Sequence, residues 1–196
     1  CARWLPRQLA LAPFYGSLAV HGWDCYALNW YNHYKSRALP EQQFIQRNLA
    51  DVAEEVEKVV DHIGRQPVVI GHSMGGMVSQ QYAQRASAPL PALVLVASVI
   101  PRELGAANIE LPAPIDDTQP FLPPPYEFAR ELFFQAVEEQ EAQREYALLG
   151  PESPAAVRDA IEHRQHVDRT KITCPVLVVG AELGLSTPGP HDRRWA

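Results

Sequence analysis

Apolar residues recur at three- and four-residue steps between residues 42 and 63, and this spacing predicts the clearest helix of the chain. Charged residues fill most of the positions between them, so the predicted helix has one apolar and one charged face. Gly64 follows directly and is typical of a helix end. We expect the apolar face to cover a sheet. The apolar positions are Ile45, Leu49, Val52, Val56, Val59, Val60 and Ile63, and the charged positions are Asp51, Glu54, Glu55, Glu57, Lys58 and Asp61.

Short and continuous apolar runs elsewhere predict strands that are buried on both faces. A second helix is predicted from about Gly76 to about Ala86, and helical turns are predicted around residues 4–11. Strands of this kind that alternate with helices are typical of a mostly parallel sheet covered by helices, so the predicted fold class is α/β. The predicted strands are residues 25–30, 67–70, 92–97 and 175–179.

A long segment, residues 101–173, separates the last two predicted strands. It begins with proline-rich stretches and continues with helical patterns near residues 126–148 and 154–163. Ser153-Pro154 fits a helix start, because serine is a good cap and proline is accepted at the first helical position. We expect residues 1–100 and 174–196 to form the core, and residues 101–173 to form a helical cap. The Pro-x-x-Pro sequence from Pro120 to Pro123 fits a stiff hinge of this cap better than a docking peptide.

The sequence Gly71-His72-Ser73-Met74-Gly75 has the form Gly-x-Ser-x-Gly and lies between a predicted strand and a predicted helix. The bare pattern arises by chance in about one of fifteen chains of this length, but it seldom falls in that context. A serine on such a sharp turn exposes its hydroxyl at the cost of backbone strain. Gly71 and Gly75 meet the need for small neighbours, and Gly76 adds room. The motif predicts a nucleophile elbow with Ser73 as the nucleophile, while His72 is expected to pack beside it.

On these residues the chain resembles the α/β-hydrolase superfamily, in its capped form with a serine nucleophile. The matching stretches occur in the order of that family and span most of the chain. They are residues 22–29, 33–36, 71–76 and 174–182. The resemblance implies an α/β-hydrolase fold and a triad of Ser73, an Asp or Glu, and a His. It also implies an oxyanion hole formed by the backbone N–H of Met74 and one N–H from an earlier loop.

The resemblance leaves the acid and the base open. Glu182 is a candidate acid, although the aspartate of the family is expected where Gly184 stands, and Asp192 is another candidate. His191 is the candidate base, although the histidine of the family follows one more helix and strand. His21-Gly22 is not expected to be the oxyanion loop, because the predicted strand at Cys25 leaves no room for a helix between them. We therefore expect a fragment without the first strands and the C-terminal histidine region.

Composition limits the classes of partner. Hydrophobic residues make up 46% of the chain and charged residues 20%, as in globular proteins. The formal net charge is −6 and no basic stripe is present, which argues against nucleic acid and anionic membranes as partners. No apolar run approaches the roughly 20 residues of a membrane span, and the first residues lack a secretory layout. We expect a cytoplasmic protein. Its three cysteines do not indicate a disulfide scaffold.

Two further groups of residues leave alternatives open. His33 lies among Trp30, Tyr31 and Tyr34, which either line a substrate mouth or form a packed loop. His163 and His166 resemble half of a metal site, but without a third ligand a solvated surface is the better interpretation.

The function predicted is that of a serine hydrolase. It would cleave a small-molecule carboxylic ester or thioester through an acyl-enzyme on Ser73, with no cofactor or metal. Phenylalanines in the predicted cap favour a substrate with an apolar group. Two alternatives stay open: a catalytically incomplete hydrolase-like protein that binds a ligand or partner, and an acyltransferase. The phenylalanines are Phe121, Phe128, Phe133 and Phe134.

Overall fold

A parallel sheet with helices forms the centre of the molecule. The computed structural model describes residues 12–180, and within this range the sheet has three strands in the order β1-β2-β3. The strands are β1 (Val69–His72), β2 (Leu93–Val96) and β3 (Val176–Val179). Each neighbouring pair is parallel, with Val69 opposite Leu93 and Leu93 opposite Val176. The α/β class predicted from the apolar runs is therefore confirmed.

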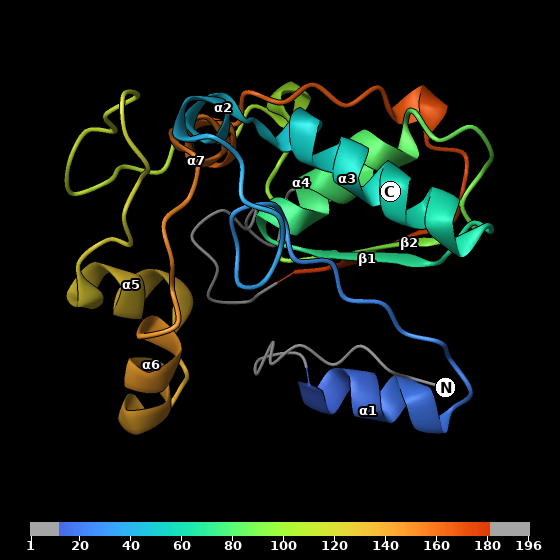
Figure 1. Ribbon diagram of the computed structural model, residues 1–196, viewed down its shortest axis with the longest axis horizontal. Helices are drawn as coiled ribbons and strands as arrows, with labels where there is room; N and C mark the ends of the chain where they lie inside the picture. Colours follow the sequence, from blue (N-terminus) through green and yellow to red (C-terminus); the bar gives the residue numbers. More distant parts are fainter. Residues whose placement is uncertain (1–11, 181–196) are drawn as a thin grey trace.

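One face of the sheet is covered by α3 (Leu49–Ile63) and α4 (Met74–Ala83), which lie side by side (Figure 1). Of the apolar positions predicted in α3 from periodicity, Leu49, Val52 and Val60 are buried in a core cluster shared with α4, and Val56 packs against that cluster. The core cluster of the described residues consists of Leu49, Val52, Ala53, Val60, Met77, Val78, Tyr82, Leu90, Ala156 and Val167. Burial of these side chains is the main source of stability for this layer.

The single helix predicted over residues 42–63 is two helices, α2 (Glu41–Gln46) and α3, and the prediction was wrong at this point. Asn48 accepts hydrogen bonds from the N–H groups of Ala50 and Asp51, and the Asp51 carboxylate accepts one from the Asn48 N–H. This capping box starts a new helix. Arg47 before it is extended, with φ −75° and ψ 116°. Gly64 ends α3 in the left-handed region, with φ 73°, as predicted.

The predicted strand at residues 25–30 does not form, and this too is a correction. A strand needs a neighbouring backbone to pair with, and no described strand lies beside this extended segment. Strand β1 begins at Val69 and ends at His72, two residues later than predicted at each end. Strands β2 and β3 agree with their predictions to within one residue. Residues 4–11, where helical turns were expected, lie outside the described residues.

The second face of the sheet is open among the described residues. Side chains alternate along β1, so that Gly71 points toward α4 while Ile70 and His72 point away from it. The register places Ile70 beside Val94 and Leu177 in one row of the open face. Ile70 is 42% exposed and Leu177 58%. Helix α1 (Ala12–Val20) lies on this side of the sheet in Figure 1, yet Val20 is 81% exposed. Burial on both faces was expected and is not observed within residues 12–180.

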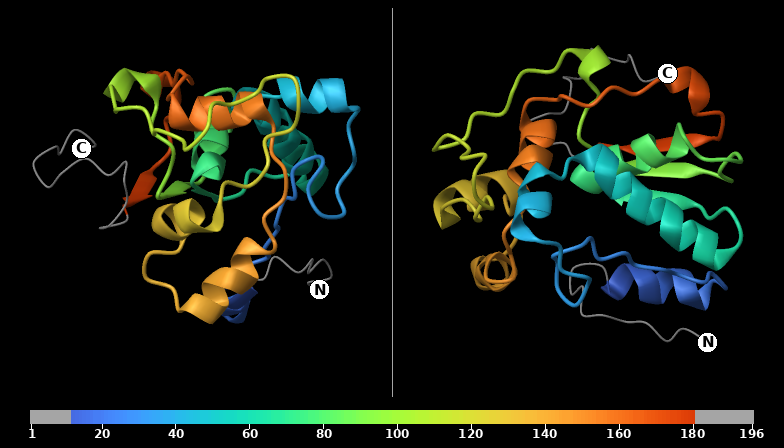
Figure 2. Two further views of the ribbon diagram at one scale, coloured as in Figure 1. Left: turned by 90° about the vertical axis from the view of Figure 1, so that its left-hand side faces the viewer. Right: turned by 45° about the horizontal axis from the view of Figure 1, so that its top comes forward.

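The inserted segment (residues 101–173) contains η1 (Arg102–Leu104), α5 (Tyr126–Phe133), α6 (Glu139–Tyr146), α7 (Pro154–Ile161) and η2 (Arg169–Lys171). The helix predicted near residues 126–148 is thus split into α5 and α6. These two helices stand away from the sheet, whereas α7 packs against α2 and α3 (Figures 1 and 2).

Ser153 shows why α7 is held so firmly against the core. Its hydroxyl accepts a hydrogen bond from the Ala156 N–H and donates one to the Arg47 carbonyl at 2.6 Å. The predicted helix start at Ser153-Pro154 is confirmed. Because Ala156 and Val167 belong to the core cluster, the end of the inserted segment is part of the core packing. A cap role for residues 101–173 stays a prediction.

Candidate active site

Ser73 lies on a sharp turn between β1, which ends at His72, and α4, which begins at Met74. Its backbone has φ 52° and ψ −122°, a conformation that is costly for any residue with a side chain. The Ser73 N–H donates to the Val96 carbonyl at 3.1 Å, and the Ser73 carbonyl accepts from the N–H groups of Gly76 and Val99, both at 3.0 Å. Hydrogen bonds from α4 and from the end of β2 therefore hold the strained turn in place.

The Ser73 hydroxyl is not used for structure in the described part of the chain. A serine before the first residue of a helix usually accepts a hydrogen bond from that helix, but Ser73 makes no such cap. Among residues 12–180 its hydroxyl has no hydrogen-bond partner, and the residue is only partly buried. The turn therefore presents an unused hydroxyl at the carboxyl end of a central strand.

The backbone N–H of Met74 lies at the start of α4, where the first N–H groups of a helix have no acceptor within it. The Gly76 N–H is already bonded to the Ser73 carbonyl. No acceptor for the Met74 N–H is found within residues 12–180. The positive end of the helix dipole adds to this donor, so the position next to the Ser73 hydroxyl suits an oxygen with negative charge.

Two of the three glycines around Ser73 are required by close packing. A Cβ at Gly71 would lie 2.4 Å from the Gly75 carbonyl oxygen and from Ser79 Oγ. A Cβ at Gly76 would lie 2.3 Å from Ser98 Oγ. A Cβ at Gly75 would meet no described atom within 4 Å. Among the described residues, close packing therefore requires a glycine at Gly71 and Gly76. The need for a small residue at Gly75 stays a prediction.

Ser98 and Gln80 support the turn and were not identified from the sequence. Ala97 follows β2 with φ 42°, which turns the chain back so that Ser98 packs against Gly76. Gln80 Nε2 donates to Ser98 Oγ at 3.2 Å, and Ser98 Oγ donates to the Val99 carbonyl at 2.9 Å. No local motif marks these residues, because the contact joins a helix to the end of a different strand.

His72 lies on the open face of the sheet, one residue before Ser73. Partial removal of water from its ring lowers its pKa below the ordinary value of 6.5, because desolvation disfavours the charged form. The ring is therefore neutral at neutral pH. That His72 packs beside Ser73 without acting as the base stays a prediction.

The candidate acids and base are not placed by the structure. Glu182, Asp192 and His191 lie outside the described residues, as does Gly184. His21-Gly22 ends α1, with Gly22 at φ 85° and its N–H bonded to the Ala19 carbonyl. The pair is thus a helix end. Its exclusion from the oxyanion loop stays a prediction, and the strand at Cys25 on which that exclusion rested does not form.

His33 packs against aromatic rings on two sides, and whether its loop also lines a substrate mouth stays open. The His33 ring makes edge contacts with Trp30 and Phe44 at centroid distances of 6.1 and 6.3 Å, while Tyr34 is exposed. His163 and His166 have separate partners: His163 Nε2 bonds to the Ala107 carbonyl, and His166 pairs with Glu103. No cluster of three or more potential metal ligands occurs among residues 12–180.

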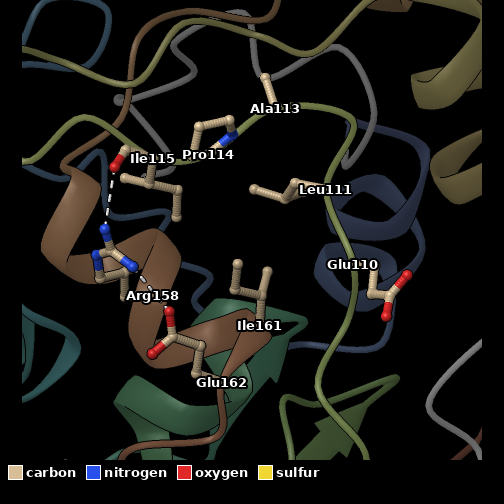
Figure 3. Close-up of a pocket in the computed structure, with 8 residues that line it drawn as sticks. All are labelled: Glu110, Leu111, Ala113, Pro114, Ile115, Arg158, Ile161 and Glu162. Atoms are coloured by element: carbon tan, nitrogen blue, oxygen red, sulfur yellow. Dashed lines mark hydrogen bonds and ion pairs between the residues drawn. The ribbon is translucent and has the colours of Figure 1, made fainter.

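The two described cavities lie within the inserted segment, away from Ser73. The first has a volume of about 340 Å³ and lies between α7 and the proline-rich chain (Figure 3). Arg158 forms one side of it and is held by Glu162 and the Ile115 carbonyl. The second, of about 270 Å³, is lined by Phe121 and neighbouring prolines. Phe121 is the one phenylalanine of the predicted apolar set that lines either of these cavities.

The parallel sheet and the strained serine between a strand and a helix define an α/β protein. A match to a family model then identifies its family. The model described as the alpha/beta hydrolase fold matches residues 10–149, well over half of the chain. The chain therefore belongs to the α/β-hydrolase fold family.

Solved structures of the same fold are similar over most of this chain. An extracellular α/β-hydrolase from a Paenibacillus species, reported to share structural and functional homology with tobacco Salicylic Acid Binding Protein 2, has a TM-score of 0.64. It is 17% identical, and the match covers 89% of this chain and 72% of that chain. A methylesterase from Arabidopsis gives a TM-score of 0.61 at 12% identity, covering 84% and 68%. A monoacylglycerol lipase from Paleococcus ferrophilus gives 0.55 at 16%, covering 87% and 67%. At these identities the likeness shows the fold alone.

The search of curated proteins finds no match. Within residues 12–180, no helix combines the length and the apolar character needed to cross a membrane.

Proposed function

We propose that the chain carries the nucleophile of a serine hydrolase, which cleaves a small-molecule carboxylic ester or thioester through an acyl-enzyme on Ser73. One observation carries the proposal. Ser73 is held at φ 52° between β1 and α4, with its hydroxyl unused and the Met74 N–H beside it without an acceptor in the described residues. Structural needs do not explain a strained serine that forgoes its helix cap.

The chemistry follows from these two groups. The Ser73 oxygen attacks the substrate carbonyl carbon as a base takes its proton, and the former carbonyl oxygen becomes negative. The Met74 N–H donates to that oxygen at the helix N-terminus. The intermediate collapses as the alcohol or thiol leaves with a proton. Water then repeats the attack on the acyl-enzyme and frees Ser73 together with the carboxylic acid.

The proposal assigns the remaining roles to residues outside the described range. Glu182 is proposed as the acid that orients the base, and His191 as the base. Asp192 is the alternative acid. The relatives with solved structures include a methylesterase and a monoacylglycerol lipase, both of which act on esters by their names. This supports an ester as the class of substrate.

Labelling with a fluorophosphonate probe tests the proposal, because the probe phosphonylates only a serine whose proton is taken by a base. Intact-mass measurement of the chain should show one adduct, and Ser73→Ala should show none. Ser87→Ala is the matched control, since Ser87 is an exposed serine in a bend after α4. It should label like the unchanged chain. A folded chain that stays unlabelled would contradict an activated Ser73.

The second candidate function is ligand binding by a hydrolase-like protein without catalysis, and Gly184 at the position of the expected aspartate favours it. Acyl transfer to an acceptor other than water uses the same residues as hydrolysis. Labelling of Ser73 would exclude the ligand-binding protein without catalysis. A test with added alcohol or amine acceptors would then separate transfer from hydrolysis.

A further inference from the structure

His33 connects the loop of residues 30–36 to the inserted segment. Its Nε2 atom lies 3.1 Å from Oε2 of Glu152, which precedes α7. Its Nδ1 atom lies 3.0 Å from the carbonyl oxygen of Tyr31 in the same loop. The side chains of His33 and Glu152 are 29% and 13% exposed, so the contact is largely shielded from water.

The geometry determines the protonation of the ring. A backbone carbonyl and an ionised carboxylate can only accept hydrogen bonds. Each nitrogen of His33 faces one of these acceptors, so both nitrogens must carry a proton for both bonds to exist. A neutral ring keeps one proton, and its second nitrogen then directs a lone pair at an acceptor. Both hydrogen bonds therefore exist together only when His33 is a cation beside an ionised Glu152.

The groups around His33 act in opposite directions on its charge. Burial disfavours the cation, whereas the hydrogen bond and the charge of Glu152, together with the Tyr31 carbonyl, favour it, and the net result is a raised pKa. Arg47, from the link between α2 and α3, opposes the cation, but it is itself paired with the buried Glu55. The rings of Trp30 and Phe44 complete the surroundings. Other cations near this loop lie over tyrosine rings: Lys35 over Tyr34, and Arg37 and Lys58 over Tyr31.

Glu152 also closes a bridge inside the inserted segment. The Phe121 N–H donates to the Glu152 carbonyl at 2.9 Å, and the Glu152 N–H donates to the Phe121 carbonyl at 2.8 Å. Oε1 of the same carboxylate accepts the Ser153 N–H at 2.7 Å. Phe121 lines the second cavity. The position of the Glu152 side chain thus links the loop, the start of α7 and one wall of that cavity.

We propose that His33 and Glu152 form a proton-dependent latch, which holds the Phe121–Glu152 bridge against the loop of residues 30–36 and releases it when His33 loses a proton. The latch is closed below the pKa of His33 in the folded chain and opens as the pH rises through it, because a raised histidine pKa gives stability that is lost toward higher pH. Opening frees the wall of the cavity that Phe121 forms. This inference does not depend on the role of Ser73.

Amide hydrogen exchange on the full chain tests the latch at the N–H groups of Phe121 and Glu152. After correction for the intrinsic effect of pH, their protection should fall about fivefold between pH 6 and pH 8.5, as expected when a pair worth about 1 kcal/mol is lost. The midpoint should coincide with the titration of the His33 ring, followed by NMR. Protection that does not change with pH would overturn the latch.

Glu152→Gln is the decisive variant. A glutamine amide can accept from a protonated ring nitrogen or donate to a bare one, so protection at Phe121 should become independent of pH. Glu103→Gln is the matched control, because it neutralises the other histidine–glutamate pair, at His166, and should leave the pH dependence at Phe121 unchanged. A pH dependence that persists in Glu152→Gln would contradict the proposal. Should that variant not fold, a His33 pKa at or below 6.5 in the unchanged chain would overturn it as well.

Discussion

The two faces of the sheet differ sharply. Toward α3 and α4, the strands present buried side chains such as Leu93 and Leu95, 0% and 3% exposed. On the other face, Ile70 of β1 is 42% exposed and Leu177 of β3 is 58% exposed. The edge strand β3 is exposed on both of its faces among the described residues. Apolar side chains on the face covered by α3 and α4 therefore contribute more to the free energy of folding than apolar side chains on the open face. Within the described residues, stability comes from the face that α3 and α4 cover, and the Ser73 turn is built on that face.

The largest expected effect compares one side chain from each face. Met77 of α4 is fully buried in the core cluster, and Met77→Ala should lower the free energy of unfolding by about 2–5 kcal/mol, because it leaves a cavity. Urea unfolding followed by circular dichroism measures this. Leu177→Ala on the open face is the matched control, and should cost less than about 1 kcal/mol. Equal losses for the two variants would show that something covers the open face in solution.

A second comparison uses two glycines beside Ser73. Gly71→Ala places a Cβ against the Gly75 carbonyl oxygen at 2.4 Å, so we expect a loss of about 1–3 kcal/mol in unfolding free energy. Gly75→Ala meets no described atom within 4 Å, and should stabilise α4 by up to about 1 kcal/mol, since alanine favours a helix. Thermal melts of both variants give the signs. A destabilising Gly75→Ala would mean that residues outside the described range pack on Gly75.

The smallest expected effect concerns His72 on the open face. Its pKa is lowered from 6.5, so the unfolded chain binds this proton more readily, and stability falls as the pH drops below about 6.5. His72→Gln should remove that part of the pH dependence. An NMR titration of the ring in the folded chain should show a midpoint below 6.5. A midpoint at or above that value would contradict the desolvation of His72.

Much of the framework could be predicted from the sequence because the signals are local. The strands β2 and β3 are continuous apolar runs, and the start of α7 carries its own cap and proline. Ser73 was found because the glycines of a tight turn have a fixed spacing. The break between α2 and α3 was missed although Asn48 and Asp51 form a cap signal, since the unbroken apolar periodicity on both sides outweighed it.

The remaining features depend on contacts between distant parts of the chain. Glu55 was assigned to a charged outer face, yet it is 4% exposed, because it pairs with Arg47 across the helix break and accepts the Tyr31 N–H. A lone glutamate gives no sign of such a partner. Ser98 supports the turn only because Ala97 reverses the chain. The predicted strand at residues 25–30 had the right pattern but lacks a described neighbour to pair with.

The register of the sheet has a consequence for the order of folding. Strand β1 meets β2 after a short excursion through α4, with Val69 opposite Leu93. Strand β3 pairs with β2 through Leu93 and Val176, and the whole inserted segment lies between these two strands in the sequence. The loop closed by β2–β3 pairing is longer than the loop closed by β1–β2 pairing, and its closure costs more chain entropy. We therefore expect the pairing of β2 with β3 to form late. Until then β2 has an unpaired edge, and the nascent chain is most prone to aggregate while the inserted segment is still unfolded.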